Sequence, residues 1–496
     1  MTAEVLWRRL DARMIWVDAV RSLLSLAPAG LAVGVFGVRP GPAMWPVAVV
    51  AVVGVTGAAG DALRWLKTRY RITGEHVERR TGLLVRRYRS IRRDRIRSVD
   101  TSARLRHRLA GLRLVTIGAG QHSAAGEAAL ALDAVSRETA QWLRQALLYD
   151  RPAQPETAAA SPETELARLD WRWVFYNVFN VWAYLAAAGV LWGAHWLATT
   201  FGLDLAGSLA GLVDWRQPWS VGLGLLAVGA FGVGVLAVSF LTEHWRFRLV
   251  RVPGEHGTVL RTTQGLLKTR EVNRDDDRLR GLAISEPLLW RWLGVADTNV
   301  ITTGLSMWSL SPASTILPRG PVRVARSVAT RVLGAEPLVA TLRRHPRAAL
   351  RRRVGWAVLA TGVAAGLLGW LAATVDAVPG WAPLAGLGLL PMALAAAAVA
   401  YRALGHTRSG DYLVVRSGLV SRTTAALQSR AVVGWCLRQS LLQRRLGLAT
   451  VVAATAAGDG QYAGYDLPAA EAAGFAGRAV PGLLAPFLVT DQESPQ

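Results

Sequence analysis

The stretch from Gly74 to Gly111, GEHVERRTGLLVRRYRSIRRDRIRSVDTSARLRHRLAG, decides the fold because its glycine spacing occurs three times in the chain. In each copy a second glycine follows the first after 8 residues, and a third follows after another 29. The nine glycines are Gly74, Gly82 and Gly111, then Gly257, Gly265 and Gly294, then Gly410, Gly418 and Gly447. An arginine three residues before the last glycine is also shared, as Arg108, Arg291 and Arg444. Agreement without gaps in three copies predicts that the chain is a triplication of one structural unit.

Each copy has the pattern of short strands joined by turns. Glycines on both sides of a short alternating run are typical of β-hairpin boundaries, where the backbone needs a positive φ. The run is Val77 to Arg80 in the first copy and Leu413 to Arg416 in the third. Further strand-like runs follow the last glycine, for example Leu112 to Ile117. Short strands at regular intervals predict a small antiparallel barrel or sandwich in each copy.

The first copy carries the motifs of a known family. They are Tyr-Arg-Ile-Thr-Gly at 70–74, Thr-Gly-Leu-Leu at 81–84, Asp-Arg-Ile-Arg-Ser-Val at 94–99 and Arg-Leu-Ala-Gly-Leu at 108–112. These residues resemble the bacterial pleckstrin-homology-like (PH-like) domain, and three copies behind membrane hairpins resemble the YdbT-like membrane proteins of bacteria. The resemblance covers nearly the whole chain, although the second copy gains an acidic run and the third replaces the Asp-Arg pair with Arg430-Ala431. It implies three seven-stranded antiparallel β-barrels, each closed by a C-terminal helix, and no enzymatic activity.

Composition agrees with a membrane protein of several domains. The chain has 496 residues, enough for about three or four domains, and 52% are hydrophobic, which is high for a soluble protein. The net charge is +23, and all but two of the 57 basic residues are arginines. A GC-rich genome would explain this preference, and so would selection for bidentate phosphate contacts. The single cysteine, Cys436, excludes an internal disulfide and any cysteine-based metal site, and we expect it to be a small buried residue of the third barrel.

Six apolar runs predict three transmembrane hairpins, one before each barrel. The expected helices are 22–38 and 46–63, then 173–197 and 219–241, then 354–374 and 381–400. A charged start before one apolar run could be a signal peptide, but the second run directly after it favours a two-helix hairpin. The expected segments are a first hairpin at 1–63, a PH-like domain at 64–150, a linker at 151–168, a second hairpin at 169–242, a PH-like domain at 243–342, a third hairpin at 343–401, a PH-like domain at 402–489 and a tail at 490–496.

Charge predicts the orientation of these helices. Basic residues cluster before the first helix of each hairpin and after the second, whereas the hairpin turns have almost none. Cytoplasmic loops are the basic ones, so we expect both termini and all three PH-like domains on the cytoplasmic side of a bacterial cytoplasmic membrane.

The sequence has no recognisable catalytic or metal-binding pattern. It lacks a glycine-rich phosphate loop with lysine, a His-Glu-x-x-His motif and a nucleophile elbow. The acidic run Asp275-Asp276-Asp277 lacks the ligand spacing of a calcium loop and is more often a solvated turn, and the eight histidines form no ligand set. We therefore expect no enzymatic activity, no cofactor and no metal.

The sharpest candidate site is a basic segment of the first copy. It contains Arg86, Arg87, Arg89, Arg92 and Arg93. The aligned positions of the second copy have one basic residue, Arg270, and the third copy has only Arg422 across 422–429. Three interpretations remain, namely a solvated face with the usual positive charge beside a membrane, contact with anionic phospholipid headgroups, or a nucleic-acid surface. Nucleic acid is disfavoured because the segment lacks the set of interleaved aromatic residues that stack on bases.

The sequence thus predicts a non-enzymatic integral membrane protein that presents three PH-like domains to the cytoplasm. There they bind membrane lipid headgroups or another membrane or cytoplasmic protein, and a role in the envelope-stress response is one option. The alternative is a component of a lipid or peptide export system. Against it, the spans lack paired buried charges, since Asp61 and Asp376 lie near helix ends.

Overall fold

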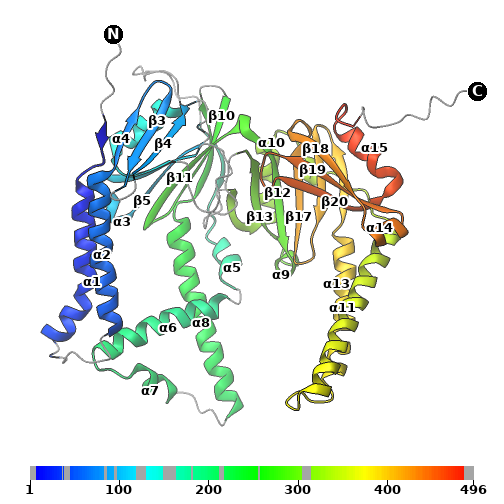
Figure 1. Ribbon diagram of the computed structural model, residues 1–496, viewed down its shortest axis with the longest axis horizontal. Helices are drawn as coiled ribbons and strands as arrows, with labels where there is room; N and C mark the ends of the chain where they lie inside the picture. Colours follow the sequence, from blue (N-terminus) through cyan, green and yellow to red (C-terminus); the bar gives the residue numbers. More distant parts are fainter. Residues whose placement is uncertain are drawn as a thin grey trace, which may run out of the picture. The chain divides into compact units, whose positions relative to one another are not determined.

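The computed structural model describes residues 7–35, 37, 45–82, 86–93, 96, 98–118, 130–148, 163–179, 182–211, 217–254, 257–303 and 314–484. The chain divides into two compact units, Met1–Asp277 and Arg278–Gln496 (Figure 1). The division falls inside the second copy of the sequence pattern, between strands β11 (Lys268–Asp275) and β12 (Leu279–Pro287). Segment 243–342, which the sequence predicts as one domain, therefore contributes to both units.

The first unit begins with a four-stranded antiparallel sheet of order β1-β2-β3-β4. Its strands are β1 (Arg8–Arg9), β2 (Arg69–Ile72), β3 (His76–Thr81) and β4 (Arg87–Arg92). The helices α1 (Arg13–Gly34) and α2 (Trp45–Lys67) lie between β1 and β2 in the chain. Because Arg8 pairs with Tyr70 and Arg9 with Arg69, the helical hairpin is an insertion between two paired strands. Strand β1 is not predicted by the sequence pattern.

A seven-stranded antiparallel sheet of order β7-β6-β5-β11-β10-β9-β8 completes the first unit. The first copy supplies β5 (Ser98–Arg104), β6 (Leu112–Gly118) and β7 (Leu130–Ser136), and the second supplies β8 (Thr164–Arg168), β9 (Arg248–Gly254), β10 (Gly257–Gln264) and β11. The two copies join where Thr101 of β5 pairs with Glu271 of β11 and Arg104 pairs with Lys268. Strand β8 lies in the segment expected as a linker, and it pairs with β9 across the inserted helices, as β1 does with β2.

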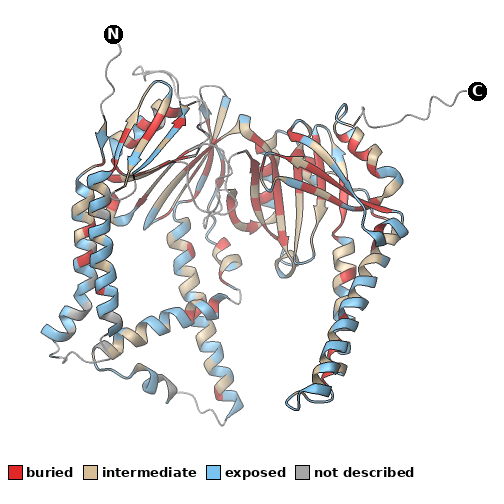
Figure 2. Cartoon of the chain, in the orientation of Figure 1, coloured by how far each residue is buried: buried red, intermediate tan, exposed pale blue. Residues whose placement is uncertain are grey.

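The core of the first copy lies between its two sheets and helix α4 (Arg137–Leu148) (Figure 2). Val77, Val99, Leu112 and Leu143 are fully buried there. Among the described residues these strands form two sheets and no closed barrel.

The helices between β8 and β9 differ from the antiparallel hairpin expected at 173–197 and 219–241. They are α5 (Trp173–Val178), α6 (Trp182–Thr200), α7 (Leu205–Ala210) and α8 (Pro218–His244). Helix α5 ends because Phe179 has a non-helical ψ of 83°. Helix α6 then crosses α8 (Figure 1), with its Ala183 carbonyl so close to Gly232 that an added Cβ would lie 1.9 Å from that oxygen.

The second unit contains a six-stranded sheet of order β14-β13-β12-β17-β16-β15 and a three-stranded sheet, β18-β19-β20. The strands after β12 are β13 (Val295–Thr302), β14 (Thr315–Pro321), β15 (Gly405–Ser409), β16 (Tyr412–Ser417), β17 (Ser421–Gln428), β18 (Val432–Arg438), β19 (Leu448–Thr455) and β20 (Gln461–Pro468). The helices are α9 (Leu288–Arg291), α10 (Val322–Leu333), α11 (Arg347–Thr374), α12 (Ala382–Gly388), α13 (Leu390–Arg402), α14 (Leu441–Arg445) and α15 (Ala469–Ala479). Here β12 of the second copy pairs with β17 of the third, from Gly281 with Leu427 to Pro287 with Ser421. A bridge between Arg343 and His406 again joins segments on either side of the inserted helices.

Glycine is required at the turns that follow β3, β10 and β16. Gly82, Gly265 and Gly418 have φ values of 120°, 106° and 118°, which side chains disfavour. A Cβ on Gly265 or Gly418 would also lie 1.9 Å from a backbone carbonyl oxygen, that of Lys268 or Ser421. Five further glycines of the pattern have positive φ, and Gly74 does not.

Four helical segments of the described chain are long and apolar enough to cross a membrane. They are Ala48–Lys67, Pro218–His244, Arg347–Thr374 and Ala382–Arg402. The sequence predicts six, but α1 and α6 are not among the four. The span expected at 22–38 extends beyond the described residues, and α6 contains His195 among several tryptophans.

Candidate membrane-facing ends of the two units

In the first unit, the turn after β10 is attached to the end of the apolar helix α8. The Gly265 N–H donates to the Trp245 carbonyl at 2.9 Å, and the Leu266 N–H donates to the Thr242 carbonyl at 2.8 Å. The turn therefore lies at the level where α8 ends. We call this end of the sheets, in either unit, the helix-proximal end.

The short helix α3 (Leu105–Leu109) lies at the same end, because β5 runs toward it. Arg104, the last residue of β5, pairs with Lys268 directly after the turn. Arg108 of α3 then reaches the second copy, since its Nη1 donates to the Leu266 carbonyl at 2.6 Å. This contact gives a structural reason for the arginine that precedes the last glycine in the sequence pattern.

Large apolar side chains are exposed at this end. They are Leu105, Leu109, Leu266 and Leu267, with Leu109 82% exposed. Exposed apolar side chains next to the end of a membrane-spanning helix are typical of a surface that contacts the headgroup region.

The second unit has a similar arrangement beside the end of α13. Arg416 Nε donates to the Ala403 carbonyl at 3.2 Å, and the Leu288 N–H of α9 donates to the Val420 carbonyl at 2.7 Å. Leu289, Trp292, Leu293 and Val420 are exposed here, with Trp292 at 82%.

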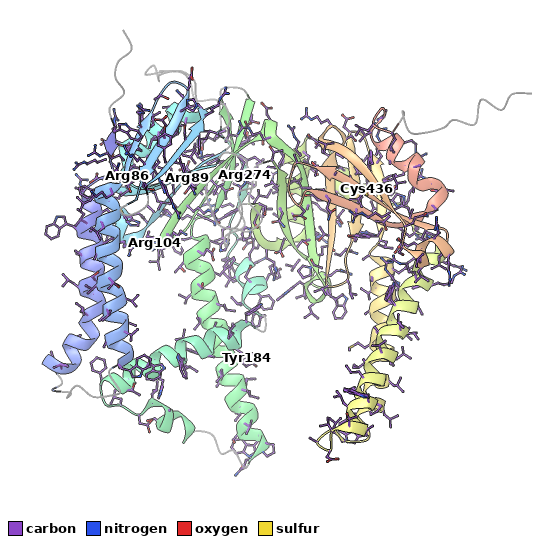
Figure 3. All side chains as sticks on the ribbon, in the orientation of Figure 1. Arg86, Arg89, Arg104, Tyr184, Arg274 and Cys436 are labelled. Atoms are coloured by element: carbon purple, nitrogen blue, oxygen red, sulfur yellow. The ribbon has the colours of Figure 1, made fainter. Side chains whose placement is uncertain are left out.

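The five candidate arginines of the first copy do not form one cluster, because they are spread along strand β4 and the residues that flank it. Figure 3 labels two of them, Arg86 and Arg89. Strand β2 starts directly after α2, and the register places Thr81 opposite Arg87 and His76 opposite Arg92. Arg86 and Arg87 therefore lie at the helix-proximal end, whereas Arg92 lies at the other end of β4, about 17 Å away at 3.3 Å per residue.

Arg93 has a structural contact at that far end. Its guanidinium donates to the carbonyls of Gly74, at 3.5 Å, and Ala146. Ala146 lies in the last turn of α4, where carbonyls lack partners within the helix. Arg93 thus provides a hydrogen-bond donor for a carbonyl at the end of α4, the helix that covers the first core.

The strand environment explains why the first copy is more basic than the other two at these positions. Strands β11 and β17 each pair with a strand of the neighbouring copy, β5 and β12 respectively. Strand β4 has no such partner and is the edge of its sheet among the described strands. Charged side chains on an exposed edge prevent pairing with another chain. Arg87, Arg89 and Arg92 lie on this edge, so the contrast between copies does not by itself indicate lipid binding.

A buried ion pair that sequence reasoning missed anchors α11 to the second unit. Arg352 and Arg353 donate to the fully buried Asp466, and Gln443 Nε2 donates to the same carboxylate at 2.8 Å. Burial alone would raise the pKa of Asp466, but the hydrogen bonds from Arg353 and Gln443 outweigh burial and hold the pKa below its usual value. The arginine run at the start of α11 was visible in the sequence, but it was interpreted only as a sign of how the helices are oriented in the membrane.

Two other expectations concern single groups. The expectation that Cys436 is buried is wrong, because its strand β18 is a sheet edge and the thiol is exposed. In the acidic run, Asp276 pairs with Arg251 at 2.8 Å. Among the described residues, no three or more histidine, cysteine or acidic side chains are grouped to hold a metal ion.

Two pairs of antiparallel sheets define a protein built on small β-domains, and four of the described helical segments inserted between the strands are long and apolar enough to cross a membrane. The family described as Bacterial PH domain matches residues 22–151 and 350–474, which together make up just over half of the chain. The chain belongs to this family. The matches include the inserted helices of the first and third copies, and the second copy lies outside them. No curated protein and no solved structure matches the chain.

Proposed function

We propose that the chain is a non-enzymatic membrane protein made of three copies of one unit, whose helix-proximal ends bind anionic phospholipid headgroups at the cytoplasmic leaflet. The observation that carries the proposal is the pair of hydrogen bonds from the Gly265–Leu267 turn to the end of α8. They keep Leu266 and Leu267 level with the end of that helix, which is where an apolar span would leave the bilayer. PH domains generally bind lipid headgroups or proteins, which agrees with this use of the domain.

Charge and apolar burial act together at this end. Each basic residue close to an anionic leaflet contributes about 1 kcal/mol. In the first unit these residues include Arg86 and Arg87 at the start of β4, and Arg104 directly before the exposed leucines of α3. The domain is already tethered by its helices, so weak contacts are occupied at a high local concentration.

The test uses the full chain in lipid nanodiscs, since removing the second copy would expose β5. A fluorophore on Leu109→Cys, with Cys436→Ser, should be quenched by spin-labelled acyl chains in phosphatidylglycerol discs and less in phosphatidylcholine discs. Salt should reduce the difference because the charges are screened.

The matched pair Arg87→Gln and Arg92→Gln removes one charge from either end of β4. Arg87→Gln should weaken the quenching and Arg92→Gln should leave it unchanged. Equal quenching in both lipids, or equal effects of the two substitutions, would contradict the proposal and favour a protein partner.

A further inference from the structure

The second unit contains a cavity of about 660 Å³ beside the end of α13. Its lining combines the last turn of α13, the segment 338–345 and the joined strands β12, β16 and β17. Six arginines line it, namely Arg326, Arg343, Arg344, Arg402, Arg416 and Arg422. The only acidic residue in the lining is Glu286.

Glu286 cannot neutralise this charge. The buried carboxylate accepts a hydrogen bond from Arg422 Nη2 and lies 4.0 Å from Arg326 Nη2. Arg416 instead donates its Nε to a backbone carbonyl. Burial, and then the neighbouring Arg422, lower the pKa of Arg416, as expected where cations outnumber their counterions.

Buried guanidinium donors next to the cavity also lack acceptors. Arg422 Nε has none, and neither have Nε and Nη2 of the adjacent Arg291. A buried N–H group without an acceptor is costly, so such groups usually meet a ligand or water.

We propose that this cavity binds a phosphate-bearing anion, either a phospholipid headgroup or a soluble phosphate ester. The guanidinium fork matches phosphate oxygens in pairs. The volume lies within the usual range of small-molecule sites, about 300–1,000 Å³. Arg402 ends a candidate membrane span, which places the cavity at headgroup depth. Binding of a phospholipid headgroup in this cavity rests on the function proposed above, whereas binding of a soluble phosphate ester does not.

The experiment measures thermal unfolding of the full chain in an uncharged detergent. The probes are phosphatidylglycerol, glycerol 1-phosphate and, as controls, phosphatidylcholine and glycerol. An anion that binds only the folded state should raise the melting temperature. Stabilisation by phosphatidylglycerol alone assigns the lipid source, and stabilisation by glycerol 1-phosphate as well assigns phosphate chemistry that does not need acyl chains.

Variants keep the test independent of folding. Arg416→Gln with Arg422→Gln should weaken the anion affinity about tenfold or more, the loss expected for hydrogen bonds to a charged group. Arg430→Gln with Arg478→Gln removes the same charge elsewhere in the unit and should not. Glu286→Gln removes the competing carboxylate while keeping every arginine, so it should tighten binding.

Unchanged affinity in Arg416→Gln with Arg422→Gln would overturn the proposal, as would weaker binding in Glu286→Gln or no stabilisation by either phosphate probe. These results are independent of the Leu109 fluorophore in the first unit. Failure of the cavity is therefore distinguishable from failure of the membrane-facing surface.

Discussion

Gly265 and Gly418 show how strongly a single backbone position constrains these sheets. Both combine a positive φ with a carbonyl oxygen 1.9 Å from the place of a Cβ. Gly265→Ala and Gly418→Ala should each lower the free energy of unfolding by more than about 1 kcal/mol, because the native conformation is incompatible with alanine. Chemical unfolding of the full chain measures the loss. Gly434→Ala is the control, since Gly434 has open space and no positive φ, and an equal loss there would contradict the explanation.

Asp466 permits a test of the buried ion pair with little change of shape. Its φ is 58°, a conformation that asparagine also tolerates, so Asp466→Asn removes the charge and leaves the backbone acceptable. The substitution leaves Arg352 and Arg353 without their carboxylate, and removing one partner of a buried pair costs about 3–5 kcal/mol. Unfolding measurements should show a loss of this size for Asp466→Asn and almost none for the exposed Asp411→Asn. Equal stability of the two variants would mean that the pair does not anchor α11.

The contact between the segment before α11 and strand β15 should make the second unit sensitive to acid. His345 and His406 are buried with ring centroids 4.9 Å apart, and burial lowers the pKa of each to about 4. Arg343 lowers the pKa of His406 further, whereas Glu471 raises it. Between pH 6.5 and pH 4 the unfolded chain binds more protons than the folded chain, so stability should fall as pH falls through this window.

Thermal unfolding at pH 7.5, 5.5 and 4.5 measures this dependence. His406→Gln cannot titrate, so it should flatten the profile between pH 6.5 and 4. Asp466 contributes mainly below its usual pKa of 3.8, where the unfolded chain takes up the proton before the folded chain does, and therefore below this window. An unchanged pH profile in His406→Gln would show that these histidines are not responsible.

The join between β5 and β11 is testable by crosslinking. Thr101 and Glu271 are direct cross-strand partners, and antiparallel partners have Cα separations of about 4.5–5.5 Å, which suit a disulfide. Thr101→Cys with Glu271→Cys, in Cys436→Ser, should oxidise readily, as an electrophoretic mobility shift would show. Thr101→Cys with Arg270→Cys places the thiols on opposite faces and should not. Equal crosslinking of both pairs would argue against this register.

Across the whole molecule, the sequence predicted the local pattern better than the partners of each element. Glycine spacing and alternation located hairpins such as the one turning at Gly418, because local backbone conformation decides them. Pairing between copies has no local signal, since any uncovered edge could accept another strand. For the same reason the sequence did not show that Arg86 and Arg92, which are close in the chain, lie at opposite ends of β4. It also did not predict the lining of the arginine-rich cavity, which comes from elements far apart in the chain.

The repeated join also bears on how such a chain can change length during evolution. Both joins use the same two strand positions, the strand before α3 or α9 in one copy and the strand after the glycine turn in the next. A gene that lost the segment from β8 through α10 would still offer β5 an equivalent partner in β17. Duplication of that segment would add one more join of the same kind. Copy number can therefore change by whole copies of the pattern. Among the described strands, each version leaves two strands of the join positions without a partner from another copy, here β4 and β18.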